Sequence, residues 1–83
     1  MTIDCRLPGD REIAKRVRRV LVDGKDAGND VYFADEEAGE VKRYLRTHKG
    51  LVPRQCPSPF AGAFNEGGVW AESLTGTVVI EIA

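Results

Sequence analysis

The side chains that could carry out covalent or metal chemistry are few and far apart in the sequence. His48 is the only histidine, and Cys5 and Cys56 are the only cysteines. They show neither the Cys-x-x-Cys nor the His-x-x-x-His spacing that zinc sites use. A nucleophilic Cys56–His48 pair would also need an orienting third group and an oxyanion hole, for which the sequence offers no candidate. Cys5 and Cys56 could pair with each other, but without an export signal we expect two reduced thiols. We also expect no metal and no catalytic residue.

Acidic and glycine-rich stretches indicate turns and not ligand sites. The acidic residues of 35–40 suit a hairpin turn, although carboxylates can also bind calcium. The stretch 23–30 places Lys25 where an EF-hand loop needs an oxygen ligand, which excludes that motif. Gly67-Gly68 lacks the Lys-Ser/Thr that follows a phosphate-binding loop. We expect no cofactor, and we expect that this protein is not an enzyme.

Three aromatic residues are the best candidates for binding a partner. Phe60, Phe64 and Trp70 lie in a stretch, 53–70, that prolines and glycines interrupt repeatedly. Large aromatic side chains dominate the energetics of protein interfaces, so we predict that these three bind a partner. The alternative is that they fold back over the core, because a small core needs all the apolar area it can bury.

A basic segment, 11–19, is the second candidate for binding. Arg16, Arg18 and Arg19 could contact phosphates of a nucleic acid. Strand alternation would place Arg19 on the face opposite the other two, which dilutes the patch. The chain carries 12 basic and 13 acidic residues, a net charge of -1, which excludes a strongly basic nucleic-acid binder. A solvated face or a protein contact is therefore the favoured interpretation of this segment.

Length and composition indicate one soluble globular domain over residues 1–83, which are 42% hydrophobic and 30% charged. No apolar run is long enough to span a membrane, and the first residues lack the apolar core of a secretory signal. A domain this short buries only about 60% of the surface of its unfolded chain. A partner subunit is therefore an expected source of stability.

Hydrophobic periodicity predicts mainly strands. Segment 10–23 fits either a helix capped by Asp10 or a strand, and we expect a short helical start followed by a strand at 17–22. Alternation over 30–47 predicts a β-hairpin, and Pro53 confines any strand just before it to a sheet edge. We expect a long loop at 53–70.

The chain ends on its strongest strand signal, 75–82, which places three large apolar residues on one face. Because an exposed apolar strand is a template for aggregation, we expect this strand to be central in its sheet. The predicted fold class is mainly β, with α+β as the alternative. About five short antiparallel strands would form a small barrel, roll or sandwich, with a short N-terminal helix.

Segments 19–26, 31–41 and 76–81, which are turns and the strands beside them, resemble small uncharacterised β-strand proteins encoded by phages and prophages. The resemblance implies a virion or accessory role and supplies no catalytic residues. The leading hypothesis is a non-enzymatic domain that acts by protein–protein contact as a structural or assembly component and self-associates. The alternatives are a nucleic-acid-binding module that uses segment 11–19, or a small inhibitor of a host enzyme. We expect a cytoplasmic protein, or a virion-associated one if it is phage-encoded.

Overall fold

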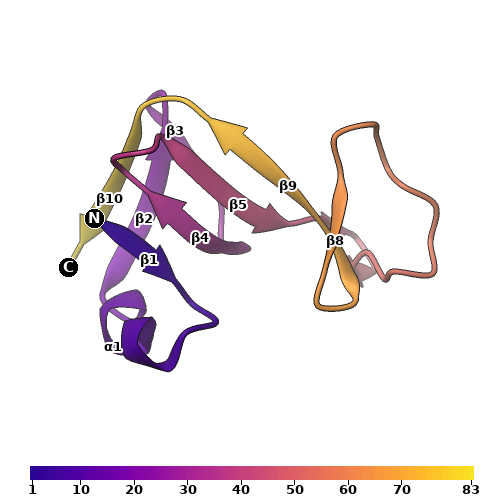
Figure 1. The fold of residues 1–83 in the computed structure, drawn as a ribbon, viewed down its shortest axis with the longest axis horizontal. Helices are drawn as coiled ribbons and strands as arrows, with labels where there is room; N and C mark the ends of the chain where they lie inside the picture. The colour runs from indigo at the N-terminus through magenta and orange to yellow at the C-terminus, as the bar shows by residue number, and fades with distance from the viewer.

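Strands dominate the computed structural model, which describes residues 1–83 (Figure 1). The mainly β class is confirmed, with 49% of residues in strands and 8% in helices. Five strands have at least five residues each: β2 (Val17–Val22), β4 (Val31–Asp35), β5 (Glu40–Tyr44), β9 (Val69–Thr75) and β10 (Val78–Ile82). The predicted hairpin at 30–47 is the β4–β5 pair, which is antiparallel.

The remaining elements are short. A 3-10 turn, η1 (Pro8–Asp10), leads into α1 (Arg11–Ala14). Segment 10–23 therefore divides as predicted, into a brief helix and the strand β2. The short strands are β1 (Thr2–Asp4), β3 (Lys25–Asp26), β6 (Arg46–Thr47), β7 (Gly50–Leu51) and β8 (Phe64–Glu66).

The strands form three sheets. A five-stranded sheet has the order β1-β4-β5-β9-β8, a three-stranded sheet has the order β10-β2-β3, and β6 pairs with β7 alone. All pairings are antiparallel, and the sheets do not close into a barrel. The chain passes between the five-stranded and three-stranded sheets three times: from β1 to β2, from β3 to β4 and from β9 to β10.

A small aliphatic core lies between the five-stranded and three-stranded sheets. It consists only of alanine, valine and isoleucine: Ile3, Val20, Ala27, Ala34, Val41, Val78 and Ile80. Strand alternation brings Ala34 and Val41 from one sheet against Val20 and Ile80 from the other. None of the six aromatic residues belongs to this core. The large side chains are therefore placed on other surfaces of the sheets.

Two expectations about the second half of the chain are corrected by the structure. The terminal strand β10 is at an edge of the three-stranded sheet, not at its centre. Only β2 lies beside β10, because β9, which precedes it in the chain, belongs to the five-stranded sheet. The expected loop at 53–70 is shorter, since β8 and the start of β9 fall inside it. The turn Gly67-Gly68 joins these two strands, with both glycines at positive φ.

Candidate functional site

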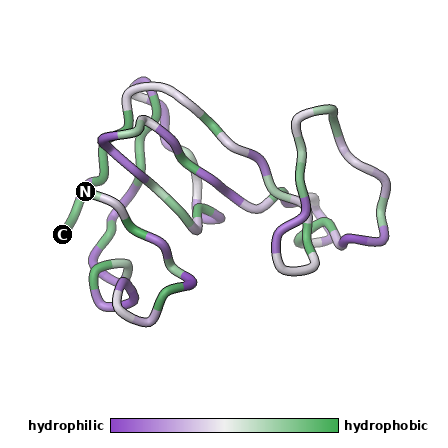
Figure 2. Tube along the Cα trace, in the orientation of Figure 1, coloured by the Kyte–Doolittle hydropathy of each residue, from purple (hydrophilic) through white to green (hydrophobic).

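The Pro/Gly-rich loop projects from the end of the molecule opposite the two termini (Figures 1 and 2). Every residue from 53 to 62 is exposed to solvent. Phe60 lies in this run, and 45% of its surface is accessible. Phe60 is thus a large aromatic side chain that the core does not use.

Trp70 has a different position, because it belongs to β9 and is half-buried. Its indole Nε1 donates a hydrogen bond to the carbonyl oxygen of Cys56 at 2.9 Å. On the same strand, the backbone amide of Trp70 donates to Val52 at 2.9 Å. Trp70 therefore fastens the loop to the sheet at two points.

Phe64 lies on the opposite face of the β8–β9 hairpin from Trp70. It pairs in register with Ala71, while Trp70 pairs with Asn65, and neighbouring residues on a strand point to opposite faces. The three predicted partner-binding residues therefore do not form one patch. Phe60 is exposed on the loop, Trp70 supports the loop, and Phe64 belongs to a separate aromatic cluster.

That cluster, which sequence patterning missed, lies on the outer face of the five-stranded sheet. The rings of Tyr32 and Tyr44 stack with centroids 4.5 Å apart. Ala71 pairs with Tyr44 on one side and Phe64 on the other, and it is fully buried although it lies outside the main core. A register shift in β4 at Tyr32 explains the miss, because the bulge changes the face that a strict two-residue alternation assigns.

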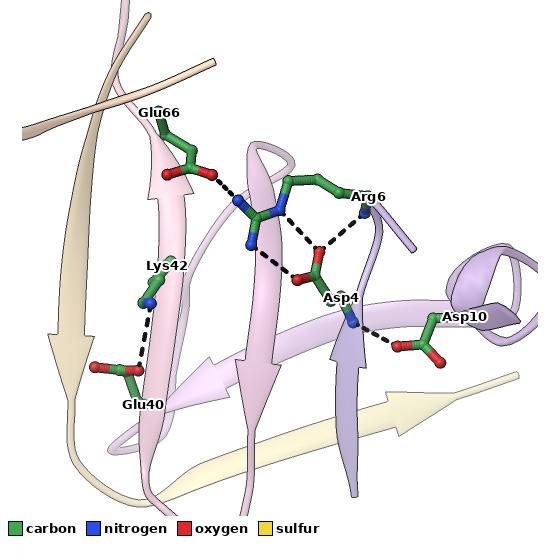
Figure 3. Close-up of polar contacts among 6 residues, drawn as sticks. All are labelled: Asp4, Arg6, Asp10, Glu40, Lys42 and Glu66. Atoms are coloured by element: carbon green, nitrogen blue, oxygen red, sulfur yellow. Dashed lines mark hydrogen bonds and ion pairs between the residues drawn. The ribbon is translucent and has the colours of Figure 1, made fainter. Parts of the chain in front are cut away.

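Arg6 lies beside this aromatic cluster. Figure 3 shows its guanidinium between the carboxylates of Asp4 and Glu66. Its guanidinium lies 4.8 Å from the Tyr32 ring centre and makes two hydrogen bonds to the Asp4 carboxylate, at 3.0 and 2.8 Å. It also forms an ion pair with Glu66 of β8. Arg6 therefore links the first and last strands of the five-stranded sheet, which no sequence spacing could indicate.

The electrostatics of this contact favour an ionised Asp4 carboxylate and a neutral Tyr32 hydroxyl. The hydrogen bonds from Arg6 lower the pKa of Asp4, although burial opposes the shift. Desolvation raises the pKa of Tyr32, so its hydroxyl stays protonated. That hydroxyl is buried without a hydrogen-bond partner. The arrangement is suited to holding β1 and β8 together.

The predicted nucleic-acid residues are all exposed, but they do not act as one group. Arg19 is held by Glu81 of the neighbouring strand, with Nε–Oε2 and Nη2–Oε1 distances of 2.5 and 3.1 Å. Arg16 precedes β2, and Arg18 occupies an irregular position in the β2–β10 pairing. Because Glu81 already neutralises Arg19, only two cations of the predicted set are unpaired.

The potentially reactive residues are not brought together as a recognisable centre. Partial desolvation and the nearby Asp4 carboxylate raise the pKa of the Cys5 thiol, although the residue is exposed, and this disfavours a reactive thiolate. Both cysteines are free. No group of three or more His, Cys, Asp or Glu side chains is placed to hold a metal ion. The structure contains no helix that could serve as a membrane span.

A cavity of about 250 Å³ lies where the two main sheets diverge near α1. Its lining includes small and aliphatic side chains, such as Ile3, Ala14, Val17 and Ala34, together with the polar Asn29. Small side chains leave this space unfilled at the end of the core. The cavity contains no group of ionisable side chains arranged for catalysis.

Comparisons with known proteins give no further guidance. No family model matches the chain, and neither a curated protein nor a solved structure matches it. The resemblance to phage and prophage proteins therefore stays a prediction.

Proposed function

We propose that this protein is a non-enzymatic β domain that acts by protein–protein contact, with the exposed loop 53–62 as its contact surface. The observation that carries the proposal is the exposure of Phe60 in a run without a single buried residue. A large aromatic side chain at such a position is typical of residues that anchor interfaces. A partner with an apolar pocket would complete its burial.

Hydrogen bonds at the base of the loop support this proposal. The Arg54 amide donates to Gly68 at 2.9 Å, and the Trp70 indole donates to Cys56. Near the anchor, the Ser58 hydroxyl donates to the carbonyl oxygen of Phe60 at 2.7 Å. A loop held in this way loses less conformational entropy on binding than a free chain. A structural or assembly component needs such a preorganised surface and no reacting group.

Site-specific crosslinking tests the proposal. A photoreactive phenylalanine at position 60 is expected to capture one protein in the cells that produce this chain. The matched control places the same residue at Ile13, which is 39% exposed on α1. Excess unlabelled wild-type protein is expected to suppress the adduct at position 60. No adduct, or the same adducts at both positions, would show that Phe60 does not anchor a contact.

A further inference from the structure

We propose that β10 pairs through its free edge with β10 of a second copy, forming a two-fold dimer with one continuous antiparallel sheet. This contact lies at the end of the molecule opposite the loop and does not depend on the proposed role of Phe60 (Figure 1). Within one chain, β10 pairs with β2 on one side and with no strand on the other. The dimer would supply the missing neighbouring strand.

The residue composition of β10 is unusual for an unprotected edge. The strand reads Val-Val-Ile-Glu-Ile, without the lysine or proline that commonly protects edges from pairing, and its one charged residue, Glu81, is paired with Arg19 of β2. Its inward side chains, Val78 and Ile80, belong to the core, while Val79 and Ile82 remain 42% and 41% exposed. Figure 2 shows the hydrophobic C-terminal end of this strand at the outside of the molecule.

The backbone of β10 presents hydrogen-bonding groups along this edge. The Asp23 amide donates a hydrogen bond to the Thr77 carbonyl oxygen, and the Ala83 amide donates to the Arg16 carbonyl oxygen. The backbone groups of Thr77 and Ala83 therefore face β2. Alternation in an antiparallel pair therefore directs the amides of Ile80 and Ile82 away from β2. The Ile80 amide donates to a carboxylate oxygen of Glu36 at 3.0 Å. This oxygen occupies the place that the carbonyl oxygen of an added strand would take.

The carboxylate of Glu36 can be displaced from the Ile80 amide by a second strand. This carboxylate also pairs with the N-terminal amine at 3.2 Å, and 32% of the Glu36 side chain is exposed. When it turns toward the amine alone, the Ile80 amide becomes free for a strand. The other edge strand of this region, β1, has only three residues, and Asp10 accepts a hydrogen bond from its Asp4 amide at 2.9 Å.

A second copy is the occupant that these observations favour. Two identical edges related by a two-fold axis are complementary to each other, so one surface serves both partners. The domain buries only 10 of 83 residues, and its two cysteines are free. Small domains without disulfides commonly gain stability from association. Pairing of β10 would cover its exposed apolar side chains and satisfy its outward amides.

Sedimentation equilibrium over a range of micromolar concentrations tests this dimer. The wild-type chain is expected to show a monomer–dimer equilibrium. Ile82→Pro removes an outward amide at the penultimate residue, and we expect it to weaken dimerisation by about tenfold or more. The matched control Ile82→Val keeps both the amide and the β-branched shape, and its dissociation constant should stay within about twofold of the wild type.

A second variant keeps the test decisive if Ile82→Pro perturbs folding. Glu36→Ala removes the carboxylate from the Ile80 amide and should tighten the dimer. If Glu36 does not compete with the second copy, the equilibrium will stay unchanged. Phe60→Ser should also leave it unchanged. A wild-type chain that stays monomeric throughout, or a dimer that is insensitive to both edge variants, would overturn the proposal. A dimer lost only in Phe60→Ser would assign self-association to the loop.

Discussion

Gly39 and Gly76 meet where turns from both sheets converge, and neither position accepts a side chain without a change. The Gly76 amide donates to the Gly39 carbonyl at 3.0 Å. A Cβ atom on Gly39 would lie 2.5 Å from the Gly76 carbonyl oxygen, and Gly39 has a φ of +68°. The nearby Asp23 carboxylate accepts a hydrogen bond from the Thr77 amide at 2.8 Å. This contact fixes the corner at which the chain passes from β9 to β10.

Alanine substitutions at two nearby glycines distinguish the strain of a left-handed backbone from a steric clash of the added Cβ atom. Gly24 also has a positive φ, of +81°, but a Cβ atom there meets nothing within 4 Å. Gly24→Ala should therefore lower the free energy of unfolding by only about 1 kcal/mol, the strain of an alanine in the left-handed conformation. Gly39→Ala adds the clash with backbone and should cost about 2–4 kcal/mol. Urea unfolding measures both, and equal losses would contradict the close approach at the corner.

Arg6 is the second residue whose role depends on tertiary contacts. Arg6→Met removes the guanidinium from Asp4, Glu66 and the Tyr32 ring together. The pKa of Asp4 should then rise toward its ordinary value, and the urea midpoint should fall. Lys15→Met is the control, because its pair with Glu12 is exposed and should contribute little. Carbon-detected NMR titration of Asp4 checks the first outcome, and an unchanged pKa would contradict the assigned contact.

At the scale of elements, the loop 53–62 depends on β9 for its shape. Trp70→Phe keeps an aromatic ring but removes the Nε1 donor to Cys56. We expect a loss of about 0.5–1.5 kcal/mol in the free energy of unfolding, the usual worth of one hydrogen bond. Local opening of the loop should be affected more, so trypsin should cleave faster after the exposed Arg54.

The control for this experiment is cleavage after another exposed residue, Lys25, in the β2–β3 hairpin. Its rate should change only as far as global stability changes. Equal acceleration at Arg54 and Lys25 would show that Trp70 supports the whole domain and not the loop in particular.

At the scale of the whole molecule, carboxylates bound in the folded state predict loss of stability in acid. Amide and amine hydrogen bonds lower the pKa of Glu36, with that from Ile80 contributing most, and Arg6 lowers that of Asp4. Arg46 has the same effect on Asp30. A lowered folded-state pKa stabilises the protein above the unfolded value, which is about 4 for these groups. This stability should be lost as the pH falls below about 4 through the folded-state values.

Urea unfolding between neutral pH and about pH 2.5 measures this dependence, since the window spans the ordinary carboxyl values. The double variant Asp4→Asn, Glu36→Gln should be less stable at neutral pH and should lose less stability on acidification. If the double variant and the wild type decline in parallel, these two carboxylates do not supply the acid sensitivity. At the alkaline end, the raised pKa of Tyr32 predicts a loss of stability above about pH 10, the ordinary tyrosine value.

Local patterns in the sequence were enough to predict the mainly β class, the β4–β5 hairpin and the short helix before β2. Each depends on side-chain alternation or on turn residues within a few positions, such as Asp23-Gly24. The same patterns indicated the loop, but they left open whether its aromatic residues cover the core or face solvent. They could not place Trp70 and Phe64 on opposite faces, because the strands that orient them lie inside a stretch rich in proline and glycine.

Tertiary structure alone decided which strands became edges and which distant residues met. The apolar pattern of β10 shows that the strand needs cover, but it does not show which strands lie beside it. The Arg6–Glu66 contact joins residues at the two ends of a five-stranded sheet, and its geometry depends on every strand between them. Alternation is a property of neighbouring residues, whereas strand order depends on the burial of several segments at once. The sequence by itself therefore determined the elements and their turns, and packing determined the surfaces available for contact.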